Sequence, residues 1–494
     1  FDHYFCNWLL GQQRRPCPPS FDSTYHAPIM LQEPVKAPEA RRFMSLGQFV
    51  FVAFFLTCGG PFGLEDAVKG GGIFLTLAGL VVLPFIWSIP QSLMTAELSS
   101  MMSVNGGSLV WVWRGLGNCA GVANAYNSLL SAMIDICLYP DLIVRYFPVH
   151  LDAAYKYPAK IAILCMITIF NAIGLNVVGA ISIFFMIMSL SVFVVEIPYA
   201  VPLITSVDYL QLPGQMDYAL LVSVLVWAYT GWDALSNFAG EVKNPTKTYP
   251  LGIALAMIAG SIAYIVPIFI SYTLLPDPEQ WGSEDALMTA AVKATGPKTW
   301  LPIWVSLAAV LANSGQLLAG MAATSRLMQA MGSSKNEAGI SIRTLPKVLG
   351  HQWERFGTPV SALVVQLLVS SVFCYWDFAS LVEFLNLLTC FRIALELAAF
   401  IALKYREPMA HRPFLVPFGL AGAWSIVVLK SIVLVLLIGT VAAKYPIMVA
   451  LSVLVNVIIV GIAYWAGGSS RDSCIGGKVP EEIDDSASIP AVFC

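Results

Sequence analysis

The chain has 494 residues, of which 57% are hydrophobic and only 12% are charged, and its mean hydropathy is +0.74. Soluble proteins carry about 25% charged residues, so this composition excludes a soluble globular protein and indicates one that lies in a membrane. The net charge of −3 is too small to predict a nucleic acid or another polyionic partner.

Apolar runs long enough to cross a bilayer recur along the chain. A membrane-spanning helix needs about 17 to 25 mostly apolar residues. About twelve runs meet this length, and they lie near 46–68, 71–95, 119–140, 159–178, 180–205, 218–240, 251–275, 302–325, 359–376, 379–403, 416–440 and 445–466. The sequence therefore predicts an all-α membrane protein, with a flexible tail at 1–43, one integral membrane domain at 44–466 and a second tail at 467–494.

The basic residues predict the orientation of these spans. With the N-terminus in the cytoplasm, 18 of the 27 Lys and Arg residues fall on the cytoplasmic side and seven fall outside. Cytoplasmic loops of membrane proteins carry such an excess of Lys and Arg. We therefore expect both termini in the cytoplasm and a multi-pass protein of the plasma membrane, with an internal membrane as the alternative.

Two of the apolar runs are interrupted. The first contains CGGPFGLEDA at 58–67, and the sixth contains Thr230, Gly231 and Asp233 within WAYTGWDALSNFAGE at 227–241. Glycine permits unusual backbone dihedrals, and Pro61 removes a backbone donor. Irregular backbone survives at membrane depth only where it lines a cavity or is buried in protein. Two broken helices five spans apart point to a transporter built from inverted repeats, with its binding site at the breaks.

Several motifs resemble one family of transporters. These are GGPFGLED at 59–66, FIWSIPQSLMTAEL at 85–98, NGG at 105–107, MIDICLYP at 133–140, GLNVVG at 174–179, AGEVKNPTKTYP at 239–250 and YREPMAHRPFLVPFG at 405–419. The chain resembles the amino acid, polyamine and organocation (APC) superfamily, and within it the polyamine uptake transporters of plants and protozoa. This resemblance implies a five-plus-five inverted repeat, the LeuT-like fold, with discontinuous helices 1 and 6.

The resemblance also implies roles for individual residues. The sixth helix of the bacterial arginine and agmatine exchangers is similar to Trp227-x-x-x-Gly231-x-Asp233. This implies that Trp227 packs on the aliphatic part of the substrate and that Asp233 lies close to the site. Light chains of heteromeric exchangers carry a cysteine between spans three and four. This chain has none between Pro140 and Pro158, so no disulfide-linked heavy chain is implied.

Carboxylates within the spans suggest the charge of the ligand. A charged residue at mid-bilayer costs about 2.5 to 3.5 kcal/mol on insertion scales, so it normally faces a cavity or a partner. The acids away from loops are Glu65, Asp66, Asp135, Glu196, Asp233, Glu241, Glu383 and Glu396. The only basic residues inside spans are Arg392 and Lys430. This excess of acids predicts a cationic ligand, a proton, or both.

Some of these acids have a structural explanation. Arg392 and Glu396 are four residues apart, a spacing at which opposite charges pair on one helix face. Glu241 and Glu97 lie near the inner ends of their spans, where we expect ion pairs with basic residues such as Arg326. Glu383 lies near an outer end and could be hydrated, whereas Glu196 fits a protonated buried carboxyl as well as a functional one.

The remaining acids, from spans one, three and six, form the predicted substrate site together with nearby glycines and aromatic residues. Aromatic faces bind ammonium groups by cation–π interaction, although Tyr126 and Trp232 fit helix packing equally well. The predicted substrate-binding residues are Gly59, Gly60, Gly63, Glu65, Asp66, Tyr126, Asp135, Tyr139, Trp227, Tyr229, Trp232 and Asp233. The candidate proton carriers are Glu65, Asp135 and Glu196.

The position of the acids favours a polyamine over an amino acid. An amino acid would place its carboxylate on free N–H groups at a helix break, and Glu65 and Asp66 directly after the break oppose an anion there. We therefore predict a secondary active transporter that imports putrescine or spermidine by alternating access, with proton symport as a further hypothesis. The alternatives are a basic amino acid or agmatine exchanger on the same fold, and a non-transporting nutrient sensor.

An enzyme is not expected. The chain has only five histidines, and neither a nucleophile–His–acid set nor a metal-ligand set is apparent, so we predict no catalytic residues, no metal and no cofactor.

Overall fold

A computed structural model describes part of the chain. The described residues are 35–36, 42–147, 151–282, 285–333, 344–353 and 357–467, without the side chains of 35–36, 175–182 and 465–467. Most of the two predicted tails therefore lies outside the described residues.

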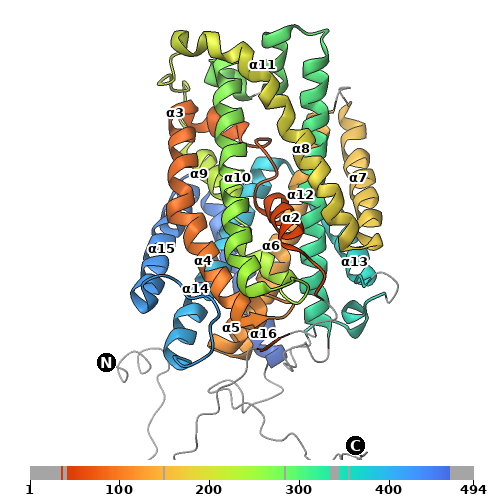
Figure 1. Cartoon of the computed structure of the whole chain (residues 1–494), viewed down its shortest axis with the longest axis vertical. Helices are drawn as coiled ribbons and strands as arrows, with labels where there is room; N and C mark the ends of the chain where they lie inside the picture. Colours follow the sequence, from red (N-terminus) through yellow and green to blue (C-terminus); the bar gives the residue numbers. More distant parts are fainter. Residues whose placement is uncertain are drawn as a thin grey trace, which may run out of the picture. The chain divides into compact units, whose positions relative to one another are not determined.

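The described residues are almost entirely helical (Figure 1). The first elements are β1 (Val35–Lys36), α2 (Leu46–Thr57), α3 (Glu65–Leu83), the π-helical turn η2 (Pro84–Ser88), α4 (Ile89–Met101), β2 (Met102–Ser103), α5 (Ser108–Leu116), α6 (Asn118–Arg145), α7 (Ala153–Ile173), α8 (Leu175–Ala200), the 3-10 helix η3 (Val201–Ser206) and α9 (Tyr218–Ala228). The later elements are the 3-10 helix η4 (Trp232–Phe238), α10 (Pro245–Leu274), η5 (Pro278–Gly282), α11 (Ala286–Thr295), α12 (Trp300–Gly332), η6 (Lys347–Gly350), α13 (Val360–Phe373), α14 (Phe378–Arg406), α15 (Gly419–Lys444) and α16 (Pro446–Gly467). The two short strands pair in parallel, with Val35 opposite Met102.

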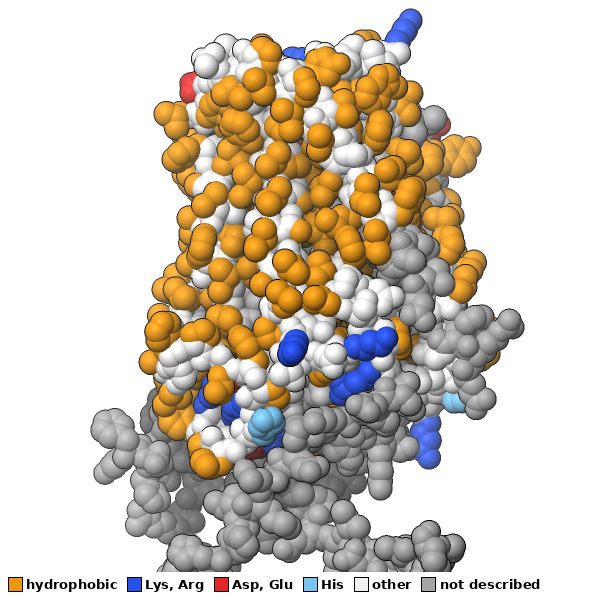
Figure 2. Space-filling model, in the orientation of Figure 1, with side chains coloured by type: hydrophobic (Ala, Val, Ile, Leu, Met, Phe, Trp, Pro, Cys, Tyr) orange, Lys and Arg blue, Asp and Glu red, His pale blue; other side chains and the backbone are white. Residues whose placement is uncertain are grey.

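Ten helices of the described residues are long and apolar enough to cross a membrane, and two shorter apolar helices are α2 and α13. Hydrophobic side chains cover most of the face in Figure 2, and several Lys and Arg side chains lie toward its lower edge. The predicted all-α membrane protein is therefore confirmed, while the count of twelve spans and the inverted repeat stay predictions.

The first interrupted run forms two helices. Ser45 and Gln48 make a capping box at the start of α2, and α2 ends at Thr57, before the Gly-Pro segment. The chain becomes helical again at Glu65, and α3 continues past a non-helical residue, Gly72, with φ 74°. The predicted boundary between the first two spans is thus a bend within α3.

The helices divide into an inner and an outer set. In an 18-residue apolar stretch of each helix, the buried share is 78% for α6 and 72% for α12. The corresponding share is only 28% for α7 and 17% for α16. Helix α12 packs on α6 and α8, and α14 packs on α5 and α6. Helix α10 packs on α2 and α8. The outer helices therefore present the apolar surface that a bilayer would contact.

Two predicted ion pairs of the span ends are present. Arg326 Nε lies 2.6 Å from Glu241 Oε1. The carboxylate of Glu97, which is fully buried, binds Lys404 Nζ at 2.6 Å and Arg412 Nη1 at 2.8 Å. The predicted pairing of Glu241 and Glu97 with basic residues is confirmed, including Arg326 as the partner of Glu241.

Candidate functional site

A cavity of about 100 Å³ lies among the inner helices. Its lining comes from α2, α6, α9, η4, α12 and α14, with single contributions from α5 and α10. The lining residues are Leu56, Thr57, Ser108, Ser128, Ser131, Ala132, Asp135, Tyr139, Trp227, Ala228, Thr230, Gly231, Asp233, Ala234, Asn237, Tyr264, Gln316, Gly320, Ala323, Thr324, Leu327, Leu385, Asn386, Thr389 and Arg392. This space is larger than a single water needs, so the cavity can hold more than one water or a small ligand.

The ends of the two broken helices meet at this cavity. Thr57 ends α2, Ala228 ends α9, and both line the cavity. The hydroxyl of Tyr264 lies 3.0 Å from the carbonyl oxygen of Cys58 and 2.7 Å from that of Ala228. Gln316 Nε2 also donates to the Cys58 carbonyl, at 2.8 Å. Polar side chains thus replace the helical partners that these carbonyls lose, as a broken helix in a membrane requires.

Two glycines allow close approach at the breaks. Gly231 has φ +104°, and a Cβ there would lie 2.8 Å from the carbonyl oxygen of Leu56. Gly63 has φ +99°, and its Cβ would lie 3.1 Å from the ring of Trp227. Larger residues are strained at such dihedrals, so these glycines let the sixth-span break pack against the first span.

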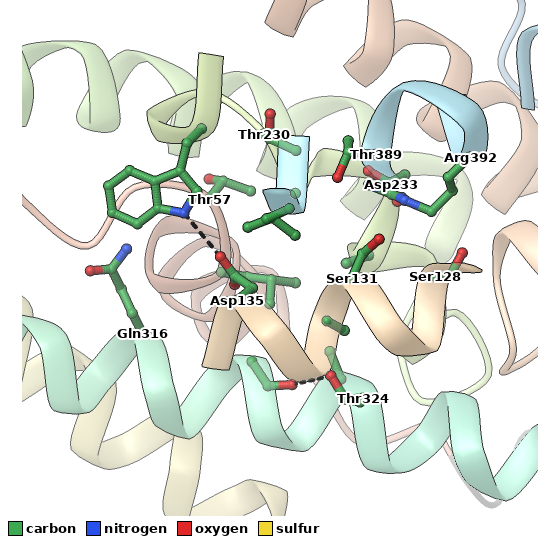
Figure 3. A pocket seen from close by; sticks show the side chains of 18 of the residues that line it. Thr57, Ser128, Ser131, Asp135, Thr230, Asp233, Gln316, Thr324, Thr389 and Arg392 are labelled. Atoms are coloured by element: carbon green, nitrogen blue, oxygen red, sulfur yellow. Dashed lines mark hydrogen bonds and ion pairs between the residues drawn. The ribbon is translucent and has the colours of Figure 1, made fainter. Parts of the chain in front are cut away.

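Asp135 is a cavity carboxylate held by neutral donors. It lies on α6 (Figure 3). There Trp227 Nε1 donates to Oδ1 at 3.0 Å and the Tyr139 hydroxyl donates to Oδ2 at 2.8 Å. Among the described residues, no Lys or Arg forms an ion pair with this carboxylate. Its negative charge is therefore available to a cation in the cavity.

Asp233 is the second cavity carboxylate, and it is already paired. Arg392 Nη1 of α14 forms an ion pair with Asp233 Oδ2 (Figure 3) and lies 3.3 Å from Glu396 Oε1. Glu396 Oε2 in turn accepts a hydrogen bond from Gln91 Nε2 at 3.0 Å. The side chains of Asp233, Arg392 and Glu396 are only 4%, 8% and 0% exposed. The predicted Arg392–Glu396 pair is present, and Arg392 also reaches the sixth-span break.

The structure brings some of the predicted substrate-binding residues to the cavity and leaves others elsewhere. The residues that line it are Asp135, Tyr139, Trp227 and Asp233. Those that do not line it are Gly59, Gly60, Gly63, Glu65, Asp66, Tyr126, Tyr229 and Trp232.

The position of Glu65 and Asp66 corrects the expectation that they face the cavity. Both lie in the first turn of α3, where acids favour the positive end of the helix dipole. Glu65 Oε2 accepts from the backbone N–H of Gly63 at 2.5 Å, and its Oε1 accepts from the Tyr146 hydroxyl. Asp66 Oδ2 lies 3.6 Å from Arg145 Nη1. These acids are bound by the protein itself because the helix restart turns them toward the end of α6.

Three predicted aromatic residues are used in packing. The Tyr126 hydroxyl donates to the carbonyl of Thr344 at 2.8 Å, and the Tyr229 hydroxyl donates to that of Leu80 at 2.9 Å. Trp232 Nε1 donates to the carbonyl of Tyr229 at 3.1 Å. Their polar atoms therefore stabilise the backbone instead of lining the cavity.

Glu196 lies between α8 and α10, away from the cavity lining. Ser271 Oγ donates to its Oε2 at 3.1 Å, and its Oε1 has no hydrogen-bond partner among the described residues. Its role as a proton carrier stays a prediction.

The sequence reasoning missed uncharged polar residues of the cavity. Gln316 lies on α12, and Asn386 and Thr389 lie on α14. A signal was present, because Asn386, Thr389, Arg392 and Glu396 recur at spacings of three and four residues and so share one face of α14.

Comparison with known proteins agrees with this architecture. Residues 49–466 match the profile of a family described as Amino acid permease. The chain belongs to this family. The permease is 35% identical over 397 residues to the polyamine transporter PUT1 of Oryza sativa subsp. japonica, which covers 79% of this chain and 72% of that relative. It is 32% identical over 418 residues to the polyamine transporter RMV1 of Arabidopsis thaliana, covering 83% and 82% of the two chains.

A more distant relative is the cystine/glutamate transporter of Homo sapiens, at 29% identity over 217 residues, or 42% of this chain and 40% of that protein. The predicted membership of the APC superfamily and the resemblance to plant polyamine transporters are confirmed. The permease is an integral, multi-pass membrane protein, and its family and relatives indicate a transporter.

Proposed function

We propose that the permease is a secondary active transporter that imports putrescine- or spermidine-type cations by alternating access. The observation that carries this proposal is a buried cavity with two carboxylates, Asp135 and Asp233, beside the two helix breaks. The proposal includes twelve spans in a five-plus-five inverted repeat, both termini in the cytoplasm, and the plasma membrane as location. The names of the plant relatives support the substrate class.

A polyamine fits the chemistry of this cavity. One ammonium group binds the carboxylate of Asp135, which has only neutral donors around it. The rings of Tyr139 and Trp227, whose centroids are 6.4 Å apart, offer cation–π and apolar contact to the adjoining methylene chain. The second ammonium group binds Asp233. Two carboxylates and an aromatic wall thus complement a flexible molecule with a charge at each end.

The first helix break is poorly suited to an amino acid carboxylate. Such an anion would use free N–H groups of the break. The N–H of Gly63 donates to the carboxylate of Glu65, and those of Cys58 and Gly59 donate to the carbonyl of Phe54. Because the protein's own acceptors take these donors, the geometry favours an amine over an amino acid.

Alternating access requires contacts on each side of the cavity to separate in turn. On one side Trp227 packs edge-on against Phe378, at 5.3 Å between centroids, and Arg145 lies 5.2 Å from the Phe378 ring. On the other side Arg326 pairs with Glu241 at 2.6 Å. We propose that the contact between Trp227 and Phe378 closes the path from the cavity to the outside. We propose that the Arg326–Glu241 ion pair lies on the path to the cytoplasm.

The membrane potential supplies a large inward drive. It contributes about 2.3 kcal/mol per elementary charge per 100 mV, hence about 4.6 kcal/mol for a dication. Proton symport is a further hypothesis, with Glu65, Asp135 or Glu196 as the carrier. It is tested by imposing a pH gradient at fixed potential, and uptake that does not respond would contradict it.

The function is tested with the purified full chain in liposomes under an inside-negative potential. Radiolabelled putrescine, spermidine, spermine, agmatine, lysine and leucine are compared as substrates. We expect uptake of the polyamines above that of lysine and leucine. If lysine is taken up as well as the polyamines, or competes with them equally, the result would favour the basic amino acid exchanger. If no compound is transported, the result would favour a sensor.

A further inference from the structure

Arg392 occupies the carboxylate that the proposed function assigns to the second ammonium group of the substrate. We propose that Arg392 is an internal counterion that competes with polyamine for Asp233, and that it replaces the substrate there when the unloaded carrier changes conformation. The permease then performs net uptake and is not restricted to exchange. This inference rests on the proposed function and names the residue that sets its transport mode.

The guanidinium of Arg392 has a second anionic partner within reach. Its Nη1 lies 3.3 Å from Oε1 of Glu396, one turn along the same helix. Gln91 donates to the other oxygen of Glu396 at 3.0 Å and so fixes that carboxylate in place. When a substrate ammonium group takes Asp233, Arg392 therefore keeps an ion-pair partner and does not become an isolated buried charge.

The charge of Asp233 needs compensation in every conformation in which the side chain is buried. Its side chain is 4% exposed, and Oδ1 has no hydrogen-bond partner among the described residues. An isolated buried carboxylate is strongly unfavourable. In the unloaded carrier Arg392 neutralises it, and in the loaded carrier the substrate takes that role. With Arg392 in this position the carrier can return without substrate.

Another buried cation of the spans, Lys430, is engaged elsewhere. Lys430 Nζ lies 3.2 Å from the centroid of the Trp87 ring and 3.5 Å from the Trp87 carbonyl oxygen. Within the described part of the chain, Arg392 is the basic residue that forms an ion pair with Asp233. The competition is therefore assigned to one side chain.

The two cavity carboxylates consequently differ. Asp135 receives hydrogen bonds from Trp227 and Tyr139 only, so an ammonium group binds it without displacing a cation. A diamine that spans both carboxylates must also displace Arg392 from Asp233. Because of this competition, the apparent affinity for a diamine equals the intrinsic affinity multiplied by the fraction of molecules in which Asp233 is free of Arg392. A monoamine that binds only Asp135 does not compete with Arg392, so its affinity is not lowered.

The test compares two transport modes of the full chain in liposomes, using labelled putrescine. Net uptake is measured into liposomes without internal amine, and exchange into liposomes loaded with unlabelled putrescine. The variants are Arg392→Gln, which removes the charge, and Arg392→Lys, which keeps it. Arg114→Gln is the matched control, since Arg114 forms an ion pair with Glu407 at the end of α14 and does not line the cavity.

We expect Arg392→Gln to lose net uptake at least about tenfold, to keep exchange within about threefold, and to bind putrescine about tenfold more tightly because its competitor is gone. Arg392→Lys and Arg114→Gln should retain both modes. If Arg392→Gln lowers both modes by the same factor, the inference is wrong. If the wild-type protein moves no polyamine in either mode, the proposed function fails and the inference with it.

A second variant keeps the inference testable if Arg392→Gln does not fold. Glu396→Gln removes the alternative partner of Arg392 and leaves Arg392 more firmly on Asp233. We expect weaker putrescine binding and unchanged binding of n-butylamine, the opposite direction from Arg392→Gln for the diamine. A purely structural role would weaken both ligands together, and that result would overturn the proposal.

Discussion

The substitution Asp135→Asn tests the carboxylate that is available to substrate. Asparagine has the shape of aspartate, and its oxygen can still accept the hydrogen bond that Trp227 Nε1 donates at 3.0 Å. The Tyr139 hydroxyl, now 2.8 Å from Oδ2, can rotate to accept from the new amide. The packing around position 135 is thus retained while its negative charge is lost.

The size of the effect follows from the surroundings of Asp135. No Lys or Arg of the described residues forms an ion pair with it, so its carboxylate has no cation that a ligand must displace. Hydrogen bonds to charged groups contribute about 1.5 to 3 kcal/mol, and removing one partner of a buried charge pair costs about 2 to 5 kcal/mol. Because asparagine keeps an acceptor, we expect a loss of about 2 to 3 kcal/mol, or roughly 30- to 150-fold weaker putrescine binding.

Equilibrium binding of labelled putrescine to the purified protein measures this loss, with uptake into liposomes as the second readout. The control is Asp152→Asn, which makes the same chemical change at an exposed residue before α7 whose side chain caps no backbone N–H. Normal elution on size exclusion shows that each variant is folded. Putrescine affinity of Asp135→Asn within about threefold of wild type, a change of less than 1 kcal/mol, would refute the reasoning.

Three further substitutions test other parts of the structure. Glu65→Gln should leave putrescine affinity within about twofold, because Glu65 binds Tyr146 and not the cavity; a loss as large as that expected for the cavity carboxylate would contradict this. Gly231→Ala should lower the yield of folded protein in fluorescence-detected size exclusion, because its Cβ lies 2.8 Å from the Leu56 carbonyl at φ +104° and the strain costs about 1 to 3 kcal/mol. Glu97→Gln should lower the thermal midpoint clearly, since breaking a buried ion pair costs about 3 to 5 kcal/mol; an unchanged midpoint would show that this cluster does not stabilise the fold.

The helix breaks could be predicted from the sequence because their cause is local. A run of glycines with Pro61 inside an apolar segment cannot continue as a regular helix. The structure accordingly ends α2 at Thr57 and α9 at Ala228, at the start of the two quoted segments. The excess of acids was equally visible, since each buried charge needs a partner wherever it lies.

The sequence does not predict which group each acidic side chain contacts. Glu65 follows the break directly, yet its partner Tyr146 lies 81 residues away and draws it from the cavity. Arg392 and Glu396 are recognisable as a pair by their spacing, whereas the contact of Arg392 with Asp233 depends on how two distant spans pack. The local sequence indicates that a buried charge needs a partner, but which group is that partner depends on tertiary packing.

The hydroxyl of Tyr264 has a consequence for how the two broken spans communicate. It lies within hydrogen-bond distance of the carbonyls of both Cys58 and Ala228, but a hydroxyl has a single hydrogen and can donate to only one of them at a time. Gln316 Nε2 also donates to the Cys58 carbonyl, whereas the Tyr264 hydroxyl lies closer to the carbonyl oxygen of Ala228. A displacement of α2 relative to α9 therefore changes which carbonyl receives the tyrosine hydrogen. When Tyr264 donates to Ala228, the Cys58 carbonyl keeps the hydrogen bond from Gln316, whereas the Ala228 carbonyl needs a water of the cavity when Tyr264 turns to Cys58.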